Sequence, residues 1–275
     1  MSAPVRLYGK GAAAGLWLYG GLVLLFLYAP ILIVMVLSVN DSASVGLPIK
    51  GLTTKWFVMI LSSTALQRAT VNSLLLGAAS AAIGTALALL LALAFRRDFP
   101  FKNAVFQLVL LPIIVPSAVL GSALLVLFDR VGLPLQLWTS VLAVHVTVVL
   151  PFAFLSLYPR LHDFDRGLEE AARDLGATPA QVMRKIVLPI IRPGILAAGL
   201  FAFSLSFDEV VRTLFLSGFD RTLPVLFWDM VAEKVSPEAP AVAVIIIVLS
   251  VVASLLGYAV AGRSGHGTQA AGRTP

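Results

Sequence analysis

The segment Leu16–Val39, LWLYGGLVLLFLYAPILIVMVLSV, contains no ionisable group apart from its tyrosines. The hydrocarbon core of a bilayer is about 30 Å thick, and an α-helix needs roughly 20 apolar residues to cross it. This segment is therefore long enough to span a membrane. It is too long for the core of a signal peptide and no clear cleavage site follows it, so we expect it to be a retained anchor.

The composition of the whole chain also places it among membrane proteins. Of its 275 residues, 59% are hydrophobic and 12% are charged, whereas soluble domains are nearer half apolar and a quarter charged. The absence of cysteine excludes a disulfide framework, a thiol nucleophile and a thiolate metal site. The net charge is +6, but the basic residues cluster between apolar segments, where they act as topology signals. We therefore expect membrane lipid around the chain and no nucleic acid partner.

Apolar segments of similar length recur along the chain and predict an all-α polytopic membrane protein with six transmembrane helices. The predicted spans are Leu16–Val39, Val71–Phe95, Ala104–Phe128, Gln136–Tyr158, Leu188–Phe207 and Ala241–Ala261. Pro112 and Pro116 interrupt the third span, which membranes tolerate where the freed carbonyls face protein or water. We expect residues 1–262 to form a single transmembrane domain, followed by a disordered cytoplasmic tail over residues 263–275.

Lysine and arginine residues predict which way the spans cross the membrane. Six spans place both termini on one side, and that side would hold 13 of the 20 basic residues against 7 on the other. The short connection between the second and third spans alone carries Arg96, Arg97 and Lys102. Short basic loops mark the cytoplasmic side. Both termini are therefore expected in the cytoplasm, together with the loop of residues 160–189 between the fourth and fifth spans.

The loop of residues 160–189 carries the start and stop signals of two short helices. Asp165 is a good N-cap for the first helix, and Gly176 stands where a left-handed helix terminus favours glycine. Thr178 and Gln181 form a capping box for the second helix, and Pro179 suits its first position. The loop is therefore expected to present a preorganised surface just under the membrane.

The first of these helices has features of a surface that binds a partner. Glu170 and Asp174 are like charges four residues apart, which slightly destabilises an isolated helix. Arg173 is expected to offset this as the i+3 partner of Glu170. One apolar face of the helix comprises Leu168, Ala171, Ala172 and Leu175. A carboxylate pair beside an apolar face is a site that a basic partner could use.

This loop resembles the EAA loop, which marks the inner-membrane permeases of binding-protein-dependent ABC importers. The residues that carry the resemblance are Glu170, Ala171, Ala172, Gly176, Ile186, Leu188 and Pro189. The resemblance implies a fold like that of the methionine importer in a bacterial inner membrane, with the loop forming a coupling helix in a groove of a cytoplasmic ATPase. Glu170 would meet a basic residue there, and Gly176 would make the turn. The alternative is a loop that packs only against its own subunit.

The resemblance also implies the partners of the chain. They are a cytoplasmic ATPase dimer, a second permease subunit, which is either homologous or identical, a periplasmic solute-binding protein and a small-molecule substrate. A P-loop needs Gly-x-x-x-x-Gly-Lys-Ser/Thr to hold phosphates, and the sequence contains neither Gly-Lys-Ser nor Gly-Lys-Thr. ATP and Mg²⁺ are therefore expected on the partner ATPase. We expect no catalytic residue, cofactor or metal on this chain.

Asp208 and Glu209 are the candidate residues of the substrate path, because carboxylates at a membrane edge are costly and usually functional. The segment around them resembles the C-type permease subunit of spermidine/putrescine importers, which implies a polyamine whose ammonium groups they would contact. The alternative is that Asp208 pairs with Arg212 and ends the helix. His145, alone within its span, is either functional or a packing residue. Other cargoes (an opine, 4-aminobutyrate or an anion) and an ATPase-independent secondary transporter are the alternative functions.

Overall fold

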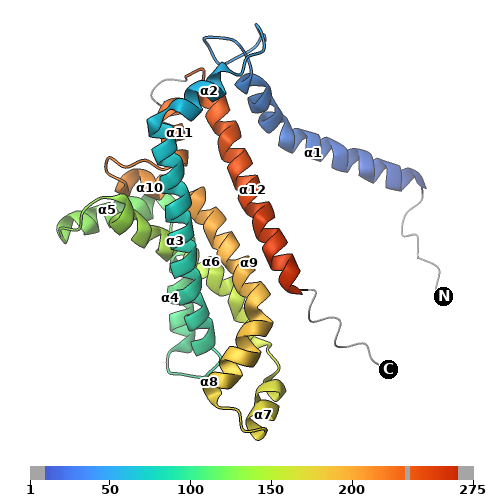
Figure 1. Ribbon diagram of the computed structural model, residues 1–275, viewed down its shortest axis with the longest axis vertical. Helices are drawn as coiled ribbons and strands as arrows, with labels where there is room; N and C mark the ends of the chain where they lie inside the picture. Colours follow the sequence, from blue (N-terminus) through green and yellow to red (C-terminus); the bar gives the residue numbers. More distant parts are fainter. Residues whose placement is uncertain (1–9, 233–235, 266–275) are drawn as a thin grey trace. The chain divides into compact units, whose positions relative to one another are not determined.

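The computed structural model describes residues 10–232 and 236–265 and is helical in every regular element that it describes (Figure 1). The helices are α1 (Lys10–Ser38), α2 (Lys55–Ser62), α3 (Thr64–Ala94), α4 (Lys102–Ile114), α5 (Ser117–Arg130), the π-helical turn η1 (Leu137–Val141), α6 (Leu142–His162), α7 (Arg166–Asp174), α8 (Pro179–Val182), the π-helical turn η2 (Met183–Val187), α9 (Leu188–Phe207), α10 (Val211–Leu216), α11 (Leu223–Ala232) and α12 (Ala239–Gly265). An all-α protein was predicted, and the described residues confirm it.

The chain divides into two compact units, residues 1–62 with 230–245 and residues 63–229 with 246–275. The first unit contains α1, α2 and the connection between them. Asn40 organises that connection: its side chain bonds Gly46 and Lys50, and its backbone carbonyl accepts a hydrogen bond from the Trp56 indole at 2.9 Å. Lys55 forms an ion pair with Asp41. The single domain expected over residues 1–262 stays a prediction.

The second unit is built around α3, α6 and α9, which pack against one another along their lengths. Small residues allow this close approach: Gly77 of α3 lies against Phe203 of α9, and Gly84 of α3 lies against Val149 of α6. Helices associate in lipid by such packing, because lipid tails supply no hydrophobic driving force between them. At one end of the bundle, Phe95 packs its ring 5.2 Å from that of Phe154 within a buried cluster.

The third predicted span, Ala104–Phe128, is not one straight helix. It is divided into α4 and α5, which lie at 103° to each other. The break falls at Val115 and Pro116, where Val115 adopts an extended backbone conformation. A residue before proline is disfavoured in the helical region, so the proline explains where the helix ends. Beyond the break, α5 packs against α10, with Gly121 facing Phe215.

The second helix of the loop is continuous with the fifth span. From α8 the helix continues through η2 into α9, so that one apolar helical stretch covers Pro179–Phe207. The π-helical turn explains how Pro189 is accommodated: proline has no N–H to donate, and the hydrogen bond before it runs from Leu188 N–H to Met183 O, five residues back. Such π-type turns are uncommon and occur often at functional sites.

Four helical stretches are long and apolar enough to cross a membrane, and the bent pair α4–α5 makes up to five. They correspond to the first, second, fourth and fifth predicted spans. The helix α12 covers the sixth predicted range, but its apolar stretch Ala239–Leu255 is not one of these four. The count of six therefore stays a prediction. Residues 263–265 of the expected tail belong to α12, and the rest of that tail lies outside the described residues.

Candidate functional site

The loop helix α7 begins and ends at the predicted residues. The Asp165 carboxylate accepts a hydrogen bond from Gly167 N–H at 2.8 Å and thereby caps the helix. At the other end Gly176 has φ +84°. Its N–H donates to Arg173 O at 2.8 Å, while Ala177 N–H donates to Ala172 O at 3.0 Å. These two bonds form a Schellman motif, which makes the turn between α7 and α8 a defined structure.

The next helical turn is fixed by the predicted capping box. Thr178 Oγ1 accepts from Gln181 N–H at 3.3 Å, and Gln181 Oε1 accepts in return from Thr178 N–H at 2.8 Å. Pro179 occupies the first turn, where a missing N–H costs nothing. Both helix ends that face each other across Gly176 are therefore satisfied by the loop itself. The exposed side chains of this loop stand on a preorganised backbone.

The seven residues of the EAA resemblance divide into an outer and an inner group. The outer, exposed residues are Glu170, Ala171, Gly176 and Pro189. The partly buried residues are Ala172, Ile186 and Leu188. Ala172, Gly176 and Ile186 line one cavity of about 370 Å³ together with Leu175. The structure thus brings three of the seven residues together at the turn.

The apolar face predicted for α7 is mostly left uncovered by this chain. Ala172 packs against the core, but Leu168 is 46% exposed and Leu175 is 90% exposed. Large apolar side chains exposed side by side mark interaction surfaces more often than scattered single ones do. The Glu170 carboxylate, on the same short helix, has no ion pair or side-chain hydrogen bond among the described residues.

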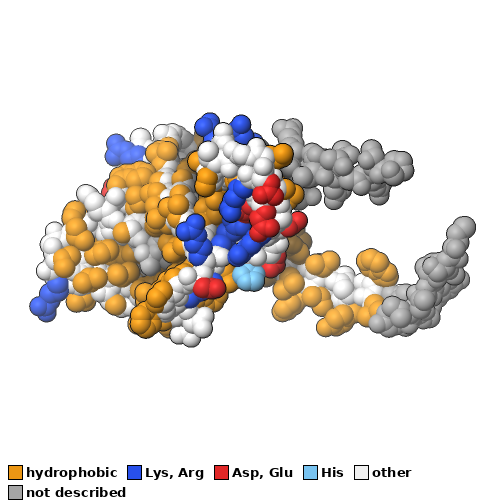
Figure 2. Space-filling model, turned by 90° about the horizontal axis from the view of Figure 1, so that it is seen from below, with side chains coloured by type: hydrophobic (Ala, Val, Ile, Leu, Met, Phe, Trp, Pro, Cys, Tyr) orange, Lys and Arg blue, Asp and Glu red, His pale blue; other side chains and the backbone are white. Residues whose placement is uncertain are grey.

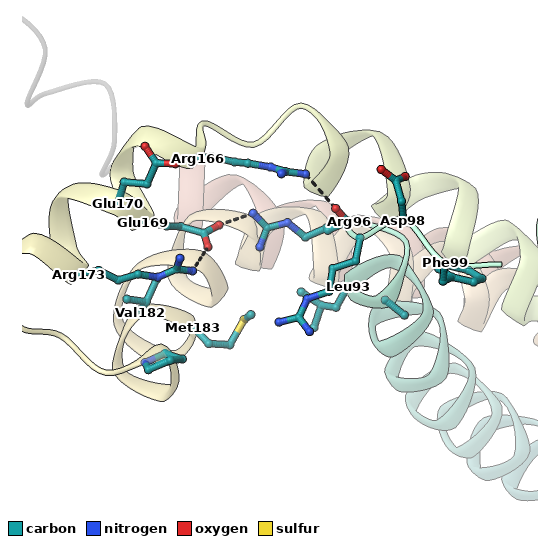
Figure 3. A pocket seen from close by; sticks show the side chains of 13 residues that line it. Leu93, Arg96, Asp98, Phe99, Arg166, Glu169, Glu170, Arg173, Val182 and Met183 are labelled. Carbon is teal, nitrogen blue, oxygen red and sulfur yellow. Dashed lines mark hydrogen bonds and ion pairs between the residues drawn. The ribbon is translucent and has the colours of Figure 1, made fainter. Parts of the chain in front are cut away.

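A buried ion pair ties α7 to the end of α3, and Figure 3 shows its members. Glu169 forms an ion pair with Arg96, and its second oxygen lies 3.4 Å from Arg173 Nη2. Arg166 Nη2 donates to Arg96 O at 2.9 Å. These residues line a cavity of about 780 Å³. Arg173 was expected to pair with Glu170; that prediction was wrong, because α7 turns Glu169 inward and leaves Glu170 outside.

The same end of the molecule carries a mixed charged surface. Viewed from the α7–α8 end, Figure 2 shows basic and acidic side chains side by side in one cluster bordered by apolar ones. Arg97, Arg166 and Glu170 are exposed members of this surface that also line the cavity. A cluster with both signs of charge, bordered by apolar side chains, can recognise a partner by complementarity.

Asp208 and Glu209 lie together at the turn between α9 and α10 but have different surroundings. Asp208 is the C-cap of α9 and is exposed, with its Oδ1 3.5 Å from Ser250 Oγ. Glu209 is largely buried and forms an ion pair with Arg212, whose backbone N–H it also accepts at 3.0 Å. Asp208 does end the helix, as the alternative predicted, but Arg212 pairs with Glu209 instead.

His145 holds α6 to this turn. Its Nε2 lies 2.8 Å from Thr213 Oγ1 and its Nδ1 lies 2.7 Å from Ser206 Oγ. Thr213 Oγ1 donates its single hydrogen to Glu209 O at 2.8 Å, so the imidazole must be the donor at Nε2, which makes Nδ1 of the neutral ring the acceptor. The described contacts match the packing interpretation of His145, and the hydrogen bonds link α6, α9 and α10.

The pairing of Arg96 with Glu169 was not predicted from the sequence. Arg96 was interpreted only as a topology signal, and Glu169 is a first-turn acid of the kind that the helix dipole favours. The two residues lie 73 positions apart, and no local pattern connects positions that distant. Only the packing of α3 beside the loop brings them together.

Comparison with known proteins places the chain in a family. Residues 84–265 match the family of binding-protein-dependent transport system inner membrane components. The spermidine/putrescine transport system permease protein PotC of Escherichia coli (strain K12) is 38% identical over 229 residues, which cover 82% of this chain and 86% of that protein. The protein of the same name from Haemophilus influenzae is 34% identical, covering 88% and 94%. The putrescine transport system permease protein PotI of E. coli (strain K12) is 35% identical, covering 81% and 82%.

Solved structures show the same fold. A bacterial ABC transporter involved in the import of alginate contains a chain with a TM-score of 0.71 and 17% identity, covering 92% of this chain and 98% of that one. A chain of the MetNI methionine ABC transporter has a TM-score of 0.60 and 19% identity, covering 73% and 96%. The described helices, the loop residues and these similarities agree: the chain belongs to the binding-protein-dependent transport system inner membrane components, the permeases of ABC transporters.

Proposed function

We propose that this chain is one permease subunit of an ATP-driven importer whose cargo is a polyamine, spermidine or putrescine. The observation that carries the proposal is the identity of 34–38% to permeases named for spermidine and putrescine transport, over more than four-fifths of the chain. Paired with a second, homologous permease, the chain would form half of the translocation path. A periplasmic solute-binding protein would deliver the cargo to it.

Energy for transport would enter through α7 and α8. Both helix ends at Gly176 are capped within the loop, so the exposed Glu170, Leu168 and Leu175 form a surface that needs no reorganisation to bind a groove. A cytoplasmic ATPase dimer holding ATP and Mg²⁺ would provide that groove, with a basic residue opposite Glu170. This arrangement requires the loop and both termini on the cytoplasmic side, as the distribution of lysine and arginine favours.

The substrate path would include Asp208, with Glu209 beside it. The Asp208 carboxylate is exposed at the C-cap of α9 and forms no ion pair among the described residues. A polyamine carries several ammonium groups, each of which could form a charge-assisted hydrogen bond with it. Glu209 would contribute by shaping the turn that presents Asp208, because its own carboxylate is occupied by Arg212.

Purification and reconstitution test this proposal. The full chain, tagged and purified from its native membranes, should bring down an ATPase and a second permease. The reconstituted complex should take up labelled spermidine only with its binding protein outside and ATP on the ATPase side. Uptake of 4-aminobutyrate or an anion, but not of polyamines, would contradict the cargo. Uptake driven by an ion gradient without any ATPase would contradict the whole mechanism.

One substitution tests the substrate path within that assay. Asp208→Asn should lower uptake efficiency for spermidine about tenfold, as expected when about 1.4 kcal/mol of charged hydrogen bonding is lost. Asp129→Asn, at an exposed carboxylate on α5, is the matched control and should leave uptake unchanged. Equal uptake by the two variants, with normal assembly, would remove Asp208 from the path.

A further inference from the structure

We infer that Glu169 and Arg96 are positioning residues that carry the movement of α7 to α3 during coupling. This inference rests on the proposed function, since it concerns how force from an ATPase spreads through the permease. Neither residue belongs to the seven that carry the EAA resemblance. The pair lies on the inner side of the loop, opposite the exposed Glu170.

The chain itself connects α7 to two of the three packed helices. Residues 163–165 join α6 to α7, and the stretch from Gly176 through α8 and η2 joins α7 to α9. No such connection reaches α3, which ends at Ala94; Arg96, two residues beyond that end, lies 73 residues before Glu169. The Glu169–Arg96 pair supplies that third connection. With it, all three helices of the bundle are attached to the loop.

The loop holds Arg96 at three points. Glu169 pairs with its guanidinium, Phe164 places its ring 5.5 Å from the guanidinium carbon, and Arg166 donates to its backbone carbonyl at 2.9 Å. A cation over an aromatic face and a charge-assisted hydrogen bond are both directional. Contacts from three loop residues on one side chain and its backbone fix its position, where a single surface ion pair would not.

Burial makes this connection stiff. The Glu169 and Arg96 side chains are only 10% and 12% exposed, so their attraction is weakly screened by water and salt. Arg96 follows Phe95 directly, and Phe95 is buried against Phe154 and Phe99. The arginine therefore stands on an anchored backbone. A displacement of α7 would move the end of α3, because neither partner has freedom to absorb it.

Arg173 is a natural control for this inference. It reaches the other oxygen of Glu169 at 3.4 Å, but its side chain is 55% exposed and belongs to α7 itself. An exposed pair within one helix contributes little and connects no second element. Removing Arg173 therefore tests whether coupling depends on every ion pair of Glu169 or only on its pair with Arg96, which reaches the end of α3.

The test compares transport with ATP hydrolysis in the complete reconstituted transporter. Glu169→Gln and Arg96→Gln should each lower the number of spermidine molecules moved per ATP hydrolysed about tenfold, within the range known for coupling mutations. ATP hydrolysis itself should change less than twofold. Arg173→Gln should keep the wild-type ratio. A proportional fall of uptake and hydrolysis, or no change, in complexes that assemble normally would overturn the inference.

A chemical link separates the role in coupling from a role in folding. The chain has no cysteine, so Arg96→Cys with Glu169→Cys creates the only thiol pair in this subunit. A short, flexible methanethiosulfonate cross-linker should restore the transport ratio of this variant, and cleavage by dithiothreitol should abolish it again. If the glutamine variants do not assemble, the cross-linked double-cysteine variant provides the test. A cross-linked complex that does not regain the wild-type ratio of uptake to ATP hydrolysis overturns the inference. Failure of the wild-type complex to use ATP would instead refute the proposed function.

Discussion

Two buried ion pairs of the same chemistry occupy the two functional regions, and they have different consequences. Glu169–Arg96 joins positions 73 residues apart, whereas Glu209–Arg212 spans three residues at the α9–α10 turn. The side chains of both pairs are about equally buried. The long-range pair connects a loop to a packed helix, while the local pair only shapes a turn. The distance in sequence therefore distinguishes the two pairs: Glu169–Arg96 can transmit movement between elements, whereas Glu209–Arg212 stabilises a single turn.

The largest effect is expected from removing one member of the local pair. Arg212→Met leaves the Glu209 carboxylate buried without its cation, which should lower the free energy of unfolding by about 3–5 kcal/mol. The effect should appear as a lower midpoint of denaturation in detergent. Arg130→Met, at an exposed arginine, is the control and should stay within about 0.5 kcal/mol of wild type. A small effect of Arg212→Met would show that water reaches Glu209.

A smaller loss of stability is expected at His145, which ties the same turn to α6. His145→Leu removes the acceptor of Ser206 and the donor to Thr213, leaving buried polar groups unsatisfied at a cost of about 1–3 kcal/mol. His162→Leu, at an exposed ring, should leave the denaturation midpoint unchanged. If the two variants behave alike, the hydrogen bonds of His145 are not what holds α10.

The comparison also shows what a sequence can reveal. The caps at Asp165, Thr178 and Gln181 and the turn at Gly176 depend on neighbours within a few positions, and the structure confirms all of them. The resemblance of the loop predicted the family. Most of the fold class followed from apolar segments long enough to cross a bilayer.

What the sequence left open depends on packing between distant residues. Pro116 marked the break in the third span, but the 103° turn between α4 and α5 also reflects the packing of α5 on α10. The rotation of α7, which turns Glu169 rather than Glu170 inward, follows from its contact with the end of α3. The Glu169 and Glu170 carboxylates look equivalent in the sequence, because the two residues are neighbours near the start of the same helix.

That adjacency gives a sharper test of the coupling region. Glu170→Gln should weaken the coupling of uptake to ATP hydrolysis about tenfold, which corresponds to about 1.4 kcal/mol, because the exposed carboxylate would lose its basic partner on the ATPase. The denaturation midpoint of the isolated permease should not change, since Glu170 has no ion pair within the described chain. Asp129→Asn, at the exposed carboxylate of α5 outside the loop, is the control. Lower stability of the isolated Glu170 variant would mean that the residue works within its own subunit.

The smallest effect on the coupling of uptake to ATP hydrolysis is expected at the turn between α7 and α8. Gly176→Ala meets no neighbouring atom within 4 Å, but the backbone there has φ +84°, which costs a residue with a Cβ about 1–2 kcal/mol. Gly199→Ala in α9, where the added Cβ would be 3.6 Å from Thr85 Oγ1, is the control without this backbone constraint. If the turn only connects two helices, both variants should keep the wild-type ratio of uptake to hydrolysis. A lower ratio confined to Gly176→Ala, with the denaturation midpoint changed by no more than this amount, would show that the shape of the turn itself takes part in coupling.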